Sequence, residues 1–158
     1  MNKIKLPSDA EFYEDDHLLV WRPCGLLNKT AVNGIITILG ELEAALDEPF
    51  NRFSDTLAAD AVDLNFEYII QVSLYRRSVY ANRPPIKSAI LATDSTLIHY
   101  GKVHALLTQG SSIKARVFQD RREAARWLGA PIELLAWKAA DQTNRTNKHE
   151  NKISTPSP

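Results

Sequence analysis

The sequence has little of the residue types that mark several specialised protein classes. Cys24 is the single cysteine among 158 residues, which excludes an intramolecular disulfide and a cysteine-rich zinc site. We interpret Cys24 as a small buried apolar residue within a strand. The six glycines are scattered, and none of them forms a P-loop or a dinucleotide-binding fingerprint.

The sequence also lacks a net charge and a long apolar run. Its 19 Lys and Arg residues balance 19 Asp and Glu residues, so no overall field attracts nucleic acid or an anionic membrane. No apolar stretch reaches the roughly 18 residues that a membrane span requires. The opening residues, MNKIKLPSDAEFYEDD, lack the apolar stretch of a secretion signal. We therefore expect a cytoplasmic protein with no nucleic-acid partner and no membrane span.

What the sequence does contain suits one domain of ordinary globular composition. Hydrophobic residues make up 44% of the chain and charged residues 24%, and the length is sufficient to bury a core. We expect a flexible N-terminus at residues 1–9 and a folded domain over 10–140. The polar residues 141–158 are expected to be disordered, because they offer few large apolar side chains to bury.

Strand and helix signals alternate along the domain and predict an α/β fold with a mixed sheet of about five strands. The first two strands are expected to form an antiparallel hairpin, and residues 57–63 a loop. Asn28, Asn65, Asp94 or Ser95, and Asp120 are the expected helix N-caps. The predicted strands are 10–13, 17–22, 50–55, 88–93 and 113–118, and the predicted helices are 28–47, 65–80, 94–108 and 121–128, with a short helix after Pro131.

The helix predicted over residues 65–80 carries apolar side chains on two sides. At 100° per residue, one set gathers on a side that should face the sheet: Phe66, Ile69, Ile70 and Leu74. A second set gathers on nearly the opposite side: Tyr68, Val72, Tyr75 and Val79. Something must cover this second stripe, either the chain's own C-terminal segment or a second molecule. We interpret the stripe as a candidate interface for a protein partner or a homodimer.

Polar residues follow the predicted strands at positions that should meet at one edge of the sheet. Open α/β sheets bind ligands at the carboxyl ends of their strands, and helix N-termini there favour an anion or a polar partner. The alternative interpretation is that these residues are only caps and turn formers. The candidate binding residues are Asp55, Thr56, Asp63, Leu64, Asn65, Asp94 and Ser95.

Metal and catalytic signatures are weak. His99 and His104 are five residues apart, which does not match the spacing that chelates zinc on a helix, and we interpret His104 as a hydrogen-bonded core histidine. No serine lies in a nucleophile elbow. We therefore predict no catalytic residue, no metal and no cofactor, with Asp55 or Asp94 as a general base kept as an alternative.

Two further groups of charged residues are interpreted as solvated surface. The first comprises the acidic residues of the helix predicted over residues 28–47, namely Glu41, Glu43 and Asp47. The second comprises the basic residues near the end of the helix predicted over 65–80, namely Arg76, Arg77 and Arg83.

The order strand, strand, helix, strand, helix, strand, helix, strand, helix resembles the STAS fold of anti-sigma-factor antagonists and sulfate-transporter tails. It resembles in particular the SpoIIAA-like branch, which is grouped with the SEC14-type lipid-binding fold. The resemblance covers about residues 10 to 130. It is carried by DHLLVWRPCG (16–25), PFNRFSDT (49–56), PPIKSAILAT (84–93) and VFQDRREAARWLG (117–129).

The resemblance implies a binding or regulatory domain. In the antagonists, a serine or threonine that opens the central helix is phosphorylated by a partner kinase. The corresponding stretch here is Asp63-Leu64-Asn65-Phe66, and Leu64 has no hydroxyl to accept a phosphate. The sequence therefore predicts a non-enzymatic STAS-like domain that contacts a protein partner or its own copy. The alternative is a small-molecule or lipid-binding domain of SEC14-like type, with a pocket lined by residues such as Phe66, Ile70 and His104.

Overall fold

The computed structural model describes residues 4–136 and contains a five-stranded mixed sheet with strand order β1-β2-β4-β6-β7. The first two strands form the predicted antiparallel hairpin, and the remaining neighbours are parallel. This confirms the expected α/β class. The strands are β1 (Ala10–Tyr13), β2 (Leu18–Trp21), β4 (Asn51–Asp55), β6 (Ile86–Leu91) and β7 (Ile113–Phe118).

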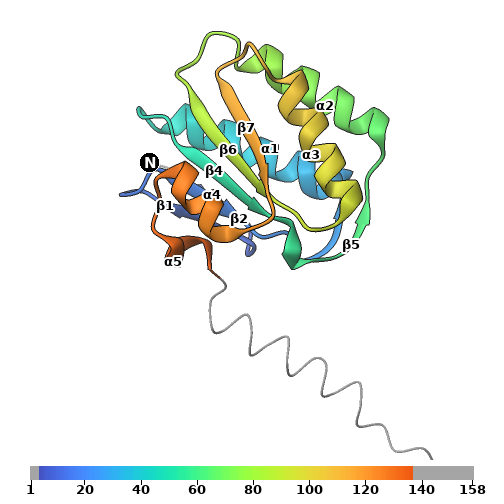
Figure 1. The fold of residues 1–158 in the computed structure, drawn as a ribbon. Helices are drawn as coiled ribbons and strands as arrows, with labels where there is room; N and C mark the ends of the chain where they lie inside the picture. The colour runs from blue at the N-terminus through green and yellow to red at the C-terminus, as the bar shows by residue number, and fades with distance from the viewer. Residues whose placement is uncertain (1–3, 137–158) are drawn as a thin grey trace, which may run out of the picture.

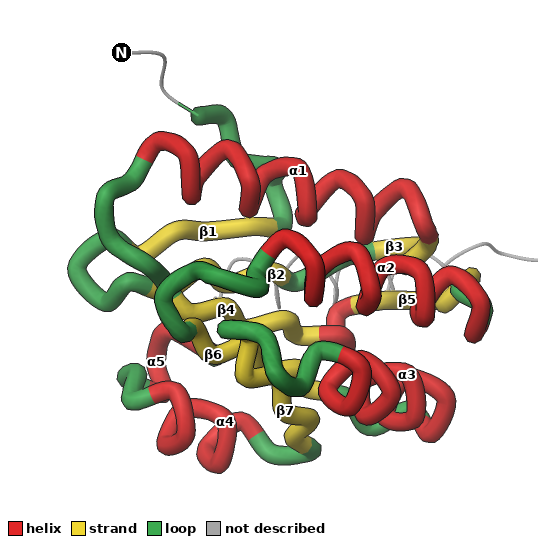
Figure 2. Tube along the Cα trace, turned by 90° about the horizontal axis from the view of Figure 1, so that it is seen from above, coloured by secondary structure: helices red, strands yellow, loops and turns green. Residues whose placement is uncertain are grey.

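Helices cover both faces of this sheet (Figure 1). Three long helices lie on one face, and a short helical pair lies on the other, as the view along the sheet shows (Figure 2). The helices are α1 (Lys29–Ala45), α2 (Phe66–Val79) and α3 (Ser95–Leu107) on the first face, and α4 (Arg121–Leu128) and α5 (Ile132–Leu135) on the second. The predicted end of the domain at 137–140 and the tail at 141–158 lie outside the described residues.

The predicted N-caps are confirmed because each side-chain oxygen accepts a bond from a backbone N–H of the first turn. Asn28 caps α1, Asn65 caps α2 and Asp94 caps α3, with N···O distances of 2.9, 2.8 and 3.0 Å. Asp120 caps α4, which ends at Gly129 with a positive φ of 69° that glycine adopts without strain.

A second, two-stranded parallel sheet pairs β3 (Gly25–Asn28) with β5 (Ala59–Asp63). The loop predicted over residues 57–63 is therefore wrong: a 3-10 helix (Thr56–Ala58) leads into a strand there. Each of these strands is short and finds its partner more than 30 residues away, so no local hairpin signal marks it. Cys24 lies just before β3, outside a strand, and it is exposed, so its predicted burial is also wrong.

Alternation along the strands divides the core into two layers. Leu19 and Trp21 of β2 point toward α1, whereas Leu18 and Val20 point toward α4 and α5. Ile4 and Leu6, from the segment predicted to be flexible, pack against the α1 layer. Within residues 4–136 no helix has the length and apolarity needed to cross a membrane.

Candidate functional site

A cavity of about 140 Å³ lies between the main sheet and the three helices α1, α2 and α3. Most of its wall is apolar and comes from every surrounding element, for example Leu19 of β2, Leu39 of α1 and Ile90 of β6. Gly101 of α3 also lines it, where a Cβ atom would lie 2.6 Å from Cγ2 of Val117, so α3 packs closely on the sheet at this point. Polar side chains complete the wall: Arg52, Ser54, Thr56, Ser73, Arg76, Ser88, Tyr100 and His104.

His104, Ser73 and Arg76 form a hydrogen-bonded group in this wall. Arg76 Nη1 lies 3.2 Å from His104 Nε2, and because a guanidinium only donates, Nε2 is the acceptor. The imidazole proton is therefore on Nδ1, which lies 2.9 Å from Ser73 Oγ, and Ser73 in turn donates to the carbonyl of Ile69 at 2.6 Å. Burial, and then the charge of Arg76, lowers the pKa of His104 from 6.5 to about 3, so the ring is neutral at physiological pH. The prediction of a hydrogen-bonded core histidine is confirmed.

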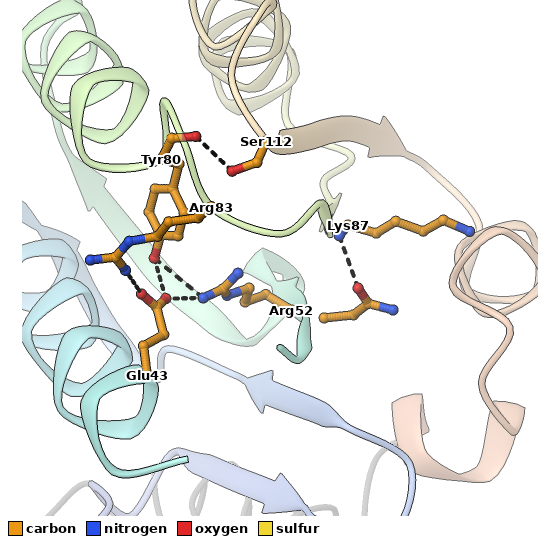
Figure 3. A network of polar contacts seen from close by, with 7 residues as sticks. Glu43, Arg52, Tyr80, Arg83, Lys87 and Ser112 are labelled. Atoms are coloured by element: carbon orange, nitrogen blue, oxygen red, sulfur yellow. Dashed lines mark hydrogen bonds and ion pairs between the residues drawn. The ribbon is translucent and has the colours of Figure 1, made fainter. Parts of the chain in front are cut away.

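Arg52, Tyr80 and Arg83 converge on Glu43 beside the cavity (Figure 3). Tyr80 and Arg52 both donate to Glu43 Oε1, Arg83 donates to Oε2, and Arg52 Nη2 lies 3.2 Å from the Tyr80 hydroxyl. We call these residues, together with Arg76, whose guanidinium lies 5.7 Å from the Tyr80 ring centroid, the Glu43 cluster. The interpretation of Glu43 and Arg76 as solvated surface is therefore wrong, because tertiary packing folds both against the interior.

Arg52 is the most deeply buried cation of the Glu43 cluster, at 3% exposure. Burial lowers its pKa from 12.5 to about 10, while Tyr80 and Glu43 act in the opposite direction, so the group keeps its charge at neutral pH. Burial lowers the pKa of Arg76 and raises the pKa of Tyr80 in the same way. The low dielectric of this buried region therefore disfavours the charged forms of Arg52, Arg76 and Tyr80.

The cavity reaches toward the surface at both ends of the strands. At the amino ends, Arg52 also lines a surface hollow with Glu43, Tyr80 and Pro84. At the carboxyl ends, Thr56, Leu64 and Leu97 line both the cavity and a second hollow. The charged groups are therefore at the amino end of the cavity, and the carboxyl end is largely apolar.

The predicted orientation of α2 is wrong for Phe66 and Leu74 and correct for Ile69, which lines the cavity. Phe66 and Leu74, expected to face the sheet, are both 47% exposed. Val72, Ser73 and Arg76 line the cavity together with Ile69, at spacings of three, four and seven residues from it. Apolar residues occur all around α2, so the sequence alone does not single out the inward side.

The predicted stripe of Tyr68, Val72, Tyr75 and Val79 is accordingly not one exposed surface. Tyr68 is 7% exposed, and its hydroxyl donates to Asn33 Oδ1 at 2.6 Å. Val72 lines the cavity, and Val79 packs on a small cluster with Tyr80, while Tyr75 is 58% exposed. The four residues of the stripe therefore lie in four different environments.

The predicted edge site comes together only in part. Thr56, Leu64 and Asp94 line the hollow at the carboxyl ends of the strands, and the Thr56 hydroxyl donates to the carbonyl of Leu91 at 2.7 Å. Asp63 is exposed at the end of β5, and Ser95 is exposed at the start of α3.

Asn65 and Asp94 act as helix caps, as the alternative interpretation of these residues proposed. Asp55 lies on the other side of the sheet, fully buried, where Arg121 donates to it at 2.7 Å and it caps the 3-10 helix. Side chains alternate between the two faces of a strand. Asp55 directly follows Ser54, so its side chain points away from the face that carries Arg52 and Ser54.

Arg52, Ser54 and Ser88 were not predicted as site residues, although their pattern gives a signal. They lie on the same face of the two central strands, β4 and β6, where a sheet buried on both faces favours apolar residues. Polar residues at such positions indicate an interior polar site. Among residues 4–136 no group of three His, Cys, Asp or Glu side chains is placed to hold a metal ion.

No known protein family matches the chain, and no curated protein matches it. Among solved structures, the chain is similar to an uncharacterised protein of the DUF3478 family with a SpoIIAA-like fold from Shewanella loihica PV-4. The two share 20% sequence identity at a TM-score of 0.48, over 75% of this chain and 89% of that chain.

Proposed function

We propose that this chain is a non-enzymatic, cytoplasmic binding domain that holds a small molecule in the cavity between the sheet and helices α1, α2 and α3. The observation that carries the proposal is the cavity itself, about 140 Å³ in volume, with an apolar wall and charged groups at one end. Binding pockets commonly combine an apolar lining with a few convergent polar groups.

The volume limits the size of the ligand. An engineered apolar cavity of about 150 Å³ binds benzene, so a cavity of this size takes a molecule of roughly six to nine non-hydrogen atoms. A membrane lipid with two long chains is far larger. We therefore narrow the SEC14-like alternative from lipids to small molecules, and the proposal includes no cofactor.

The placement of the acidic residues supports a binding role over a catalytic one. Asp55 pairs with Arg121 on the face opposite the cavity, and Asp94 caps α3. Leu64, which stands where the resembled antagonists carry a phosphorylated residue, lies in the cavity wall. These placements favour recognition of a ligand and leave neither aspartate beside the cavity's polar end.

Titration with toluene, a neutral probe of suitable size, followed by two-dimensional NMR of the full chain, tests the proposal. Resonances of residues around the cavity should shift together and saturate. Val72→Phe, which fills the cavity from α2, should abolish the shifts, whereas Gln71→Phe on the exposed side of the same helix should retain them. Toluene-induced shifts that are absent, or equal in the two variants, would contradict a ligand cavity.

A second candidate function is contact with a protein, for which we propose a second copy of this chain. Phe66, Leu74 and Leu106 are 47%, 47% and 63% exposed on the neighbouring helices α2 and α3, and Tyr75 is exposed on α2. An apolar surface shared by two adjacent helices is a common dimer contact.

Light scattering after size exclusion tests this second candidate. A dimer that Leu106→Glu converts to a monomer, while Gln109→Glu on the same side of the molecule does not, would support it. A monomer for the unmodified chain over the accessible concentration range would remove it.

A further inference from the structure

The charged end of the cavity holds more positive than negative charge. Arg52, Arg76 and Arg83 contribute three guanidinium groups, and Glu43 contributes the only carboxylate in the cluster's contacts within the described part of the chain. His104 is neutral, so it contributes neither negative nor positive charge to the cluster. The cluster therefore carries an excess of about two positive charges in a partly buried region.

Three guanidinium nitrogens in the cavity wall are buried and have no hydrogen-bond partner among residues 4–136. They are Nε and Nη1 of Arg52 and Nη2 of Arg76. Aromatic faces cover part of the Arg52 group, since its guanidinium carbon lies 4.5 Å from the Phe50 ring centroid and 5.4 Å from that of Tyr80. Such π contacts offset only part of the cost of leaving charged donors without an acceptor.

Arg52 is the structural link between the cavity and the surface. It is 3% exposed, it lines the cavity, and it also lines the hollow at the amino ends of the strands. Its Nη2 is held by Glu43 and the Tyr80 hydroxyl, which fixes the plane of the guanidinium, while its Nε and Nη1 donors have no acceptor in the described part of the chain.

On the basis of the proposed function, we infer that the ligand is a small amphiphilic monocarboxylate, whose carboxylate is held by Arg52 and Arg76 and whose hydrocarbon body fills the apolar part of the cavity. The carboxylate takes three of the roughly six to nine non-hydrogen atoms that the cavity admits, which leaves a body of about three to six carbons. A carboxylate is planar and accepts in the plane of a guanidinium, so it supplies the acceptors that the unpaired donors lack.

The opposite end of the cavity fits the hydrocarbon body. Trp21, Ile35, Leu64 and Leu97 form an apolar wall toward the carboxyl ends of the strands, where Leu64 and Leu97 also line the surface hollow. Burying an alkyl chain there removes about 25 cal/mol of unfavourable hydration per Å² of apolar surface. Carboxylate and chain are therefore both required for tight binding, and neither alone should suffice.

Isothermal titration calorimetry with three probes tests the inference on the full chain. Hexanoate carries the head group and the chain, hexanamide carries the chain without the charge, and acetate carries the charge without the chain. We expect hexanoate to bind at least about tenfold more tightly than either of the others, which corresponds to one charge-assisted hydrogen bond.

Variants assign the head-group site. Arg76→Met and Arg52→Met should each reduce the preference for hexanoate over hexanamide to about twofold or less, and Arg76→Lys should retain most of it. Arg77→Met, on the exposed side of α2, is the matched control and should leave it unchanged. Arg76→Met should also lose the Tm increase that hexanoate causes in the unmodified chain.

The outcomes separate the two proposals. Equal affinity for hexanoate and hexanamide, or hexanoate binding that persists in both methionine variants, would overturn the carboxylate inference while the cavity still binds ligands. Equal affinity for acetate and hexanoate would also overturn it, because the site would then be a simple anion site. Failure of toluene and of all three probes to bind would instead remove the proposed function.

Discussion

At the scale of single residues, His104 shows how burial sets the charge of the site. Its Nε2 accepts from Arg76, and its Nδ1–H donates to Ser73, so both ring nitrogens are satisfied only in the neutral form. A proton on Nε2 would face a guanidinium at 3.2 Å. The folded chain therefore resists protonation of this ring over a range in which the unfolded chain accepts a proton.

This difference predicts a pH dependence of stability. The pKa of His104 is 6.5 in the unfolded chain and about 3 in the folded one, so the free energy of unfolding is unaffected above pH 6.5 and falls as pH drops from 6.5 toward 3. Between pH 6.5 and 5 we expect a loss of about 2 kcal/mol from this residue. Urea unfolding of the unmodified chain and of His104→Gln measures it. A pH dependence that is equal in the two proteins would contradict the prediction.

Glu43 has a comparable structural role as the acceptor for three donors. Glu43→Gln removes the carboxylate from a partly buried cluster of guanidinium groups, so we expect a loss of about 2–4 kcal/mol in the free energy of unfolding. Glu41→Gln, exposed on the same helix, is the control and should change stability by less than about 0.5 kcal/mol. Denaturant titration measures both, and a loss no larger than that of the control would show that Glu43 contributes little.

At the scale of elements, the glycines of α1 and α3 have different surroundings. Gly34 and Gly40 lie on the exposed side of α1, and a Cβ atom at either position would meet nothing within 4 Å. Gly101 lies at the contact of α3 with β7, where the space for a Cβ is taken by Val117. The same substitution should therefore have opposite effects in the two helices.

We expect Gly34→Ala and Gly40→Ala each to raise the free energy of unfolding by about 0.5–1 kcal/mol, because alanine has the higher helix propensity. Gly101→Ala should lower it by about 1–3 kcal/mol, since α3 must move away from the sheet. Thermal unfolding of the three variants checks the contrast. Stabilisation by Gly101→Ala would show that α3 is not held tightly on the sheet.

The elements also show how far local sequence determines the fold. The N-caps Asn28, Asn65, Asp94 and Asp120 were all predicted, because a cap depends on a few neighbouring residues. The inward side of α2 was not, because apolar residues on several sides of the helix leave periodicity without a preferred direction. The β3–β5 pair was missed because strands of four and five residues carry too short a pattern to be recognised without knowing the strand with which they pair.

At the scale of the whole molecule, Arg22 joins the end of β2 to the last described helix. Its Nη2 donates to the carbonyls of Leu134 and Ala136 at 2.9 and 2.8 Å, and it thereby holds α5, with the fully buried Leu135, on the α4 face of the sheet. These contacts connect residues more than 110 positions apart, so they close the second layer of the fold.

Arg22→Met should therefore loosen α4 and α5 selectively. We expect a loss of about 1–3 kcal/mol in the free energy of unfolding, the range for charge-assisted hydrogen bonds that are removed. Hydrogen exchange should rise in α4 and α5 and stay unchanged in α1 to α3. Arg122→Met, at an exposed position of α4, is the control, and uniform exchange changes across the chain would contradict a local anchoring role.

The sequence by itself determined the five strands of the main sheet and the long helices to within a few residues, the residues that cap these helices, and the α/β class, because these depend on short-range spacing. Only the tertiary structure decided that Glu43, Arg52, Arg76 and Tyr80 meet beside an apolar cavity. They come from α1, β4 and the end of α2, and charged residues are ordinarily expected at the surface. Their burial follows from the way these elements pack against one another, which the local sequence does not specify.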